Sequence, residues 1–219
     1  MKTGSSEKAS VQLFSPKKEP TQSRAAATVH AILEGAANIL ERHGLEGYTT
    51  NEIAARAGVS IGSLYQYFPN KDAVTIALIE REMAGMVDEV IAALALTPPT
   101  RALQEAIRAA VRNQVRRPQL ARLLDFEEFR LAPLMPTLRA AKVIRDSLET
   151  FLRESYGLSG PAAEEAAVDV VEIAKALSYA SGRRGEIDAS SLTRSIEAAM
   201  LGYLNAKMHG ARGLGREVV

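Results

Sequence analysis

Residues 49–74, TTNEIAARAGVSIGSLYQYFPNKDAV, contain two helix starts separated by a short turn that includes a glycine. Thr49 precedes Glu52 by three residues, the spacing of a capping box in which each side chain binds the other residue's free backbone N–H. Gly58 follows the first helix and tolerates the positive φ of a helix C-cap. Ser60 is then in position to cap a second helix of about two turns. This pattern of helix, tight turn and short helix predicts a helix-turn-helix.

The second helix has an informative exposed face. Leu64 and Phe68 are the apolar positions that we expect to face the core. In a helix-turn-helix the first helix braces the second, whose N-terminal residues reach base edges in the major groove. Hydroxyl and amide groups can bind phosphates or bases, and an aliphatic side chain can contact a thymine methyl. The alternative is an ordinary helical hairpin whose tyrosines only complete an apolar edge. On the DNA-binding interpretation, the candidate residues are Thr50, Asn51, Ile61, Gly62, Ser63, Tyr65, Gln66, Tyr67 and Lys71.

The same stretch, with the helix before it, closely resembles the signature of TetR-type transcriptional repressors. The matching residues are Thr49, Thr50, Ile53, Ala54, Ala57, Gly58, Val59, Ser60, Gly62, Leu64, Tyr65, Phe68 and Lys71. The resemblance covers roughly residues 24–80, about a quarter of the chain, and departs from the family pattern at Tyr67, where histidine is common. It implies that one set of side chains holds the DNA backbone: Thr50, Tyr65, Tyr67 and Lys71. A second set would lie at or near base edges: Ser60, Ile61, Gly62, Ser63 and Gln66.

The resemblance also implies the wider function. It predicts a homodimer on a pseudo-palindromic operator, with the helix from Asn70 linking the DNA-binding head to a body that binds a small-molecule effector. Release of the operator would follow effector binding. The complete set of predicted DNA-binding residues is Arg24, Thr49, Thr50, Asn51, Ser60, Ile61, Gly62, Ser63, Tyr65, Gln66, Tyr67 and Lys71.

Helical periodicity continues along the rest of the chain, and no alternating strand pattern interrupts it. Aromatic residues make up only 5% of the 219 residues, and alanine and leucine are abundant, which favours helix. We therefore predict an all-α fold of about nine helices. Asn70 and Thr100 are expected to cap helices, and Pro133 and Pro136 to interrupt one. The predicted domains are a disordered basic tail (1–20), the DNA-binding domain (21–70) and a ligand-binding and dimerisation domain (71–219).

The tail is rich in Ser, Lys and Pro and has no helical period. It has two interpretations: a solubilising segment, or a flexible arm that contacts phosphates. Arg24, at the edge of the predicted helical region, is the residue that such an arm would bring closest to DNA.

The last two predicted helices, 161–182 and 188–210, carry stripes of small and branched residues. Such stripes allow close helix packing, either across a two-fold axis or against the chain's own core. A dimer is also needed to hold two recognition helices about 34–36 Å apart. The predicted dimer interface consists of Ala166, Val170, Ala174, Leu177, Ser181, Leu192, Ile196, Ala199, Met200 and Tyr203.

An effector pocket needs apolar walls and a few converging polar groups. Between the middle helices, the residues of that kind are Met86, Gln114, Phe126, Phe129, Phe151, Glu172, Lys175 and Tyr179. The alternative is that the Phe and Met side chains are plain core and that the charged ones are solvated.

Other function classes have little support in the sequence. The chain has no cysteine, which excludes disulfides and Cys-ligated metal sites. It lacks the common hydrolase, metalloprotease and phosphate-loop motifs, so we expect neither an enzyme nor a cofactor or metal. It also has no signal-peptide pattern and no apolar run long enough to span a membrane, which predicts a cytoplasmic protein. A helical enzyme or a protein-interaction module without DNA binding remains the alternative.

Overall fold

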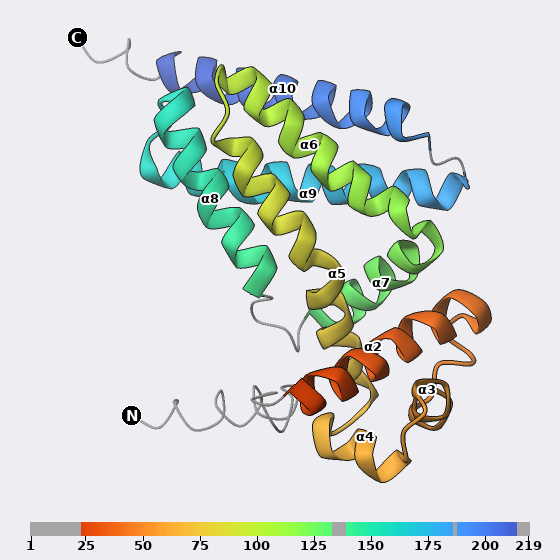
Figure 1. The fold of residues 1–219 in the computed structure, drawn as a ribbon. Coiled ribbons are helices and arrows are strands. Elements are labelled where there is room, and N and C mark those ends of the chain that lie inside the picture. The colour runs from red at the N-terminus through yellow and green to blue at the C-terminus, as the bar shows by residue number, and fades with distance from the viewer. Residues whose placement is uncertain (1–22, 133–138, 186–187, 214–219) are drawn as a thin grey trace, which may run out of the picture. The chain divides into compact units, whose positions relative to one another are not determined.

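The computed structural model describes residues 23–132, 139–185 and 188–213, with side chains as far as residue 208. Within these residues the regular structure consists of nine helices and no strand, as predicted. The predicted tail (1–20) and the prolines at 133 and 136 lie outside the described residues. Figure 1 labels the helices as α2 (Ser23–His43), α3 (Thr50–Ala57), α4 (Ile61–Tyr67), α5 (Lys71–Leu94), α6 (Pro99–Arg116), α7 (Pro118–Leu131), α8 (Arg139–Tyr156), α9 (Gly160–Arg184) and α10 (Ala189–Gly213).

Local sequence signals account for most helix ends. The Asn70 side chain accepts a hydrogen bond from the N–H of Ala73 at 2.8 Å and caps α5, as predicted. Gly157 follows α8 with φ of 67°, a conformation that glycine adopts without steric cost. The prediction for Thr100 was wrong. Helix α6 already begins at Pro99, because proline fits the first helical position, and no side chain caps it.

The chain forms two compact units. The described part of unit 1 consists of residues 23–82 and 119–132, and that of unit 2 contains residues 83–118, 139–185 and 188–213. The sequence prediction had put the boundary at residue 70, whereas the observed boundary falls inside α5. The reason is that the first turns of α5 bury Val74 and Leu78 completely, as a continuation of the head. Helix α7 also belongs to unit 1, although its sequence neighbours belong to unit 2.

In unit 1, α2 packs closely on α3. A Cβ atom added to Gly35 of α2 would lie 3.1 Å from both the backbone nitrogen of Ala57 and the carbonyl oxygen of Ile53. A side chain at this position would press against both backbones, which would have to shift by a few tenths of an ångström, so glycine suits the close approach of α2 and α3.

Unit 2 is built around α6, α8, α9 and α10. Helix α9 packs on both α8 and α10, and α10 also packs on α6 (Figure 1). The core consists of aliphatic side chains with one aromatic residue at its edge, including Leu103, Ile107, Leu148, Phe151, Leu152, Val170 and Ile196. These elements carry both the predicted dimer interface and most of the predicted effector site.

Candidate functional site

The start of α3 is capped, although only half of the predicted capping box forms. The hydroxyl of Thr49 accepts a hydrogen bond from the N–H of Glu52 at 3.2 Å. The N–H of Thr49 does not pair with the Glu52 side chain but donates to the carbonyl oxygen of Gly47 at 3.0 Å. The loop before α3 thus supplies the second partner. Glu52 and Asn51 remain exposed on the first turn.

The start of α4 follows the prediction closely. Gly58 adopts the left-handed conformation with φ of 68°, and the Ser60 hydroxyl accepts a hydrogen bond from the N–H of Ser63 at 3.0 Å. Leu64 and Phe68 are fully buried, as predicted. Their burial fixes the rotation of α4 about its axis. The opposite face is therefore turned outward.

That outward face carries aliphatic, aromatic and amide side chains and no charged one. Ile61 is 38% exposed and Tyr65 is 41% exposed, and Gln66 and Gly62 are exposed as well. A Cβ atom added to Gly62 would meet nothing closer than the Ser60 hydroxyl, at 3.8 Å. Packing within the chain therefore gives no reason for a glycine at position 62.

Two further side chains frame this face. The hydroxyls of Thr50 and Tyr65 form a hydrogen bond of 3.2 Å between α3 and α4. Lys71, at the start of α5, holds its Nζ atom 5.5 Å from the centre of the Tyr48 ring. Tyr67 and Ser63 are half-buried, and Arg24 and Thr49 are exposed. All twelve predicted DNA-binding residues thus belong to unit 1, and the structure brings those from α3, α4 and the α5 start together.

A buried polar network that the sequence analysis missed lies beside Lys71. Tyr48 is 1% exposed, and its hydroxyl forms a hydrogen bond of 3.1 Å with Thr75. Arg130 of α7 donates to Asp72 at 2.6 Å and to Glu127 at 2.6 Å. Glu127 is only 4% exposed.

The charged groups of this network shift the pKa values of Tyr48 and Arg130. Burial raises the pKa of Tyr48, and the nearby carboxylates of Glu127 and Asp72 raise it further. Hydrogen bonds to Glu127 and then to Asp72 raise the pKa of Arg130, so the guanidinium stays charged. The stretch LDFEEFR concentrates charge in the way that a solvated surface does, yet Glu127 within it is buried. Its ion pair with Arg130 explains how a carboxylate can be buried there.

Six of the ten predicted dimer-interface residues are buried within unit 2 itself, namely Ala166, Val170, Ser181, Leu192, Ile196 and Met200. These small and branched residues pack against the chain's own core, which was the alternative interpretation of the stripes. They are therefore not available to a second copy. The other four, Ala174, Leu177, Ala199 and Tyr203, are half-buried. Tyr203 also donates a hydrogen bond to Asp169 of α9.

The eight predicted effector-binding residues do not form one cluster. Phe126 and Phe129 belong to α7 in unit 1 and are 47% and 84% exposed. Glu172, Lys175 and Tyr179 are exposed on α9, where Lys175 lies 3.9 Å from Glu172. Those five therefore do not line the interior of unit 2. Met86 and Gln114 are half-buried, and Phe151 is buried against Tyr156 with ring centres 5.8 Å apart.

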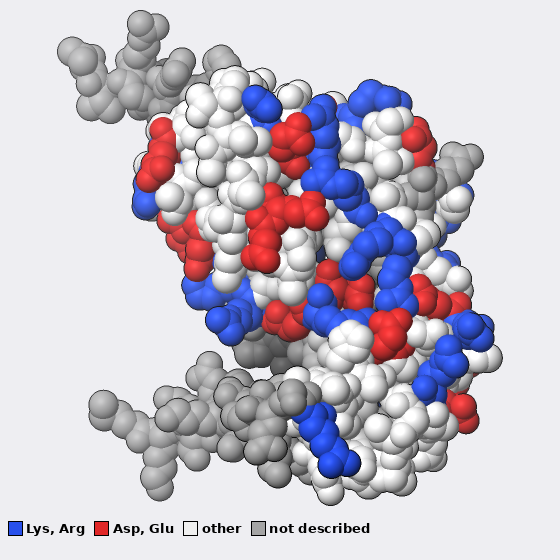
Figure 2. Space-filling model, viewed as in Figure 1, with Lys and Arg blue, Asp and Glu red and all other residues white. Residues whose placement is uncertain are grey.

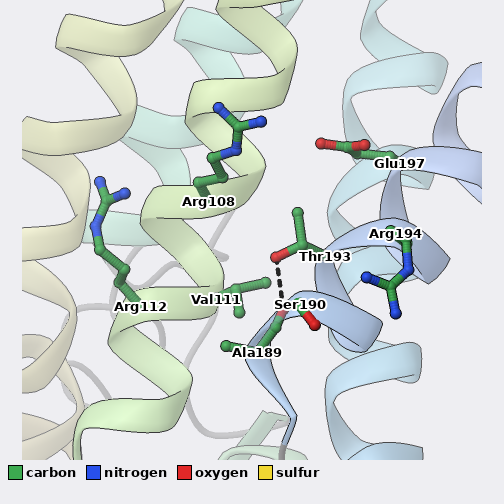
Figure 3. Close-up of a pocket in the computed structure, with 8 residues that line it drawn as sticks. All are labelled: Arg108, Val111, Arg112, Ala189, Ser190, Thr193, Arg194 and Glu197. Atoms are coloured by element: carbon green, nitrogen blue, oxygen red, sulfur yellow. Dashed lines mark hydrogen bonds between the residues drawn. The ribbon is translucent and has the colours of Figure 1, made fainter.

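Unit 2 has a pocket elsewhere, of about 420 Å³, between α6 and the first turns of α10. It is lined by Arg108, Val111 and Arg112 of α6 and by Ala189, Ser190, Thr193, Arg194 and Glu197 of α10, and in Figure 3 the side chain of Arg112 extends away from the α10 residues. None of these eight residues was predicted. Arg108 pairs with Glu105 and Arg112 with Glu89, each at 2.6 Å. In Figure 2, a band of basic side chains crosses unit 2 in the region of α6.

In the part of the chain that the structure describes, no three His, Cys, Asp or Glu residues group as metal ligands would. Likewise, none of the described helices combines the length and apolar character of a membrane span.

Comparison with known proteins gives a consistent result. Residues 32–78 match the family described as "Bacterial regulatory proteins, tetR family". The HTH-type transcriptional regulator RutR of Escherichia coli (strain K12) is 33% identical over 105 residues, which cover 48% of this chain and 50% of RutR. The chain thus matches about half the length of this curated relative.

Solved structures share the fold. The fatty acid degradation regulator FadR from Bacillus halodurans has a TM-score of 0.66 at 20% identity and covers 79% of this chain and 97% of its own. The Thermus thermophilus FadR, a TetR-family repressor solved in complex with lauroyl-CoA, has a TM-score of 0.63 at 23% identity. Its match covers 82% of this chain and 94% of FadR. At these identities the likeness concerns the fold alone.

Proposed function

Because the chain belongs to the tetR family of bacterial regulatory proteins, we propose that it is a ligand-responsive transcriptional repressor. It binds a pseudo-palindromic operator as a homodimer, and a small-molecule effector releases it. The curated relative that it matches is itself a transcriptional regulator, which argues against an enzyme. Since the protein acts on DNA, its place is the cytoplasm.

One observation carries the proposal: α4 is a capped helix whose outward face carries no charged side chain and has a glycine in its first turn. Among the described residues only the Ser60 hydroxyl comes within 4 Å of a Cβ atom added to Gly62, and this open space allows a groove edge to approach the backbone. Ile61 and Gln66 are exposed beside it and read bases, together with Ser60 and Ser63. Arg24, Thr49, Thr50, Asn51, Tyr65, Tyr67 and Lys71 hold phosphates around them.

The dimer uses a face different from the one that the sequence stripes suggested. On α10, small or short side chains that are exposed recur on the side away from the core, namely Ser191, Ser195, Ala198, Gly202, Asn205 and Ala206. The neighbouring helix α9 exposes Val168 (42%) and Tyr179 (41%). Small residues permit close helix approach, and flanking apolar residues supply area that is removed from water. The four half-buried residues of the original set lie at its margin.

The effector binds in unit 2. The Thermus thermophilus FadR holds lauroyl-CoA, so a protein of this fold can accommodate a small molecule. Met86, Gln114 and Phe151 remain candidates for the site, and the α6–α10 pocket has a volume suited to a small ligand. An effector releases the operator only if it prefers the conformation with lower operator affinity.

Selection from a pool of random duplexes tests the function. The full-length protein is expected to enrich a sequence with two related half-sites whose centres are about one helical turn apart. Light scattering coupled to size exclusion is expected to give twice the monomer mass. A monomer that retains no duplex at low salt contradicts the proposal and favours a protein-interaction module.

A further inference from the structure

We propose that Arg130 is a positioning residue for DNA binding, which links α7 to the start of α5 through Asp72 and thereby makes operator affinity depend on α7. The inference rests on the proposed function, because it assumes that Lys71 and its neighbours bind the operator. We call the cluster of Asp72, Glu127 and Arg130 the latch.

The chain path gives α7 a particular role. The chain passes between the two units inside α5, then just before residue 119, and again after α7. Helix α7 therefore packs with unit 1 while both of its connections lead to unit 2. The chain connects the two units within α5 and on either side of α7. Helix α5 runs from unit 1 into unit 2 without a break, whereas α7 begins at Pro118 after the end of α6 at Arg116, so its position in unit 1 depends on its side-chain contacts.

The latch is an ionic contact between α7 and the start of α5. Arg130 and Asp72 are 58 residues apart in sequence and form a hydrogen bond of 2.6 Å. The Nε atom of Arg130 also donates to both Glu127 oxygens, at 3.1 and 3.2 Å, which holds the guanidinium in one orientation. Glu127 is buried, so a displaced Arg130 would leave a buried carboxylate without compensation. The docked position of α7 is therefore well defined.

The other end of the latch adjoins the DNA-binding face. Asp72 directly follows Lys71, and Thr75 donates to the Lys71 carbonyl oxygen at 3.0 Å. Thr75 also pairs with the buried Tyr48, whose ring lies under the Lys71 ammonium group. The first turn of α5 is thus held from two sides, by α7 and by Tyr48. Loss of the latch frees the turn that carries Lys71.

The Asp72→Asn variant separates this idea from a simple charge effect. Removing a carboxylate near bound phosphates would by itself tighten DNA binding, because the like charges would no longer repel. The latch predicts the opposite: weaker binding by about 2- to 30-fold, the range for residues that modulate coupling between sites. Affinity is measured by fluorescence anisotropy with the duplex selected from the random pool. Asp88→Asn, an exposed acid elsewhere on α5, is the matched control and is expected to bind like wild type.

The second arm measures α7 directly. If operator affinity depends on the latch, then operator binding must in turn stabilise the docking of α7. Hydrogen exchange over residues 119–132 is expected to slow when the selected duplex is added to wild-type protein. This slowing should disappear in Arg130→Met but persist in Arg122→Met, which removes an exposed charge from the same helix. A merely structural role of Arg130 would speed exchange without removing the effect of DNA.

The outcomes are distinct. The proposed role of the latch is contradicted if Asp72→Asn binds the duplex as tightly as wild type or more tightly. It is also contradicted if hydrogen exchange in α7 is the same with and without the duplex. Either result leaves the proposed function intact. Failure of the wild-type protein to bind any selected duplex overturns the proposed function itself. If Arg130→Met does not fold, Asp72→Asn still tests the proposal, because it leaves the pair between Glu127 and Arg130 in place.

Discussion

The hydroxyl groups of Thr50 and Tyr65 lie 3.2 Å apart and connect α3 to α4 on the outward side of the head. Both residues are proposed to contact the DNA backbone. Their hydrogen bond orients the Tyr65 ring before DNA arrives, so that less side-chain freedom is lost on binding. The same pair also braces α4 against α3, independently of the buried contacts of Leu64.

Tyr65→Phe is expected to weaken operator binding by about 1 kcal/mol, roughly fivefold, because one hydrogen bond to phosphate and one to Thr50 are lost. Anisotropy titrations at fixed salt measure the change. Tyr156→Phe, which removes a tyrosine hydroxyl at the end of α8 in unit 2, is the control and should bind like wild type. The expectation fails if both variants lose affinity equally.

Lys71→Ala is expected to weaken binding to every duplex and to reduce the slope of log affinity against log salt by about one unit. The reason is that one phosphate contact fewer releases one counterion fewer. Lys142→Ala removes an exposed lysine that pairs with Asp146 in unit 2 and should leave the slope unchanged. A slope that Lys71→Ala does not alter would show that Lys71 contacts no phosphate.

Gln66→Ala and Ile61→Ala should change operator preference rather than overall affinity. A side chain that reads a base is worth about 1–3 kcal/mol of discrimination between bases. Selection from the random pool with each variant is expected to relax one position in each half-site. Equal losses on selected and random duplexes would contradict a role in base recognition.

The helix-turn-helix could be predicted from sequence because its determinants are local. The caps at Thr49, Ser60 and Gly58 act within a few residues, and burial of Leu64 follows from helical spacing. The return half of the capping box was predicted but does not form, because the Thr49 N–H donates to the Gly47 carbonyl oxygen instead. That hydrogen bond depends on how the preceding loop folds, which capping rules do not describe.

The contacts of Arg130 and the burial of the stripe residues of α9 and α10 could not be predicted in the same way. Arg130 and Asp72 are far apart in sequence, and a buried Glu127 has the same local pattern as a solvated one. A stripe such as Ala166 and Val170 likewise reads the same whether it packs on its own core or on a partner. Only the three-dimensional arrangement separates these alternatives.

Gly35→Ala is expected to destabilise the protein by about 1 kcal/mol or more, although alanine favours helix over glycine. The added methyl would press against the backbone of Ala57 and Ile53, which cannot move aside as a flexible side chain could. Gly85→Ala, in an exposed and open helical position, should instead stabilise by about 0.5–1 kcal/mol. Urea denaturation of both variants measures the two signs, and stabilisation by both would contradict the close packing of α2 on α3.

Gly202→Arg tests the proposed dimer face without disturbing the subunit. Nothing lies within 4 Å of a Cβ atom added at Gly202, so the isolated chain can accept a larger side chain there. Across a two-fold axis, however, two arginines would bring like charges together and block close approach of the helices. We expect a monomer by light scattering, an unchanged far-UV spectrum and loss of binding to the paired half-sites. Gly85→Arg adds the same side chain at an equally open position on α5 and should remain a dimer. A dimeric Gly202→Arg protein would mean that the two copies meet through a different surface.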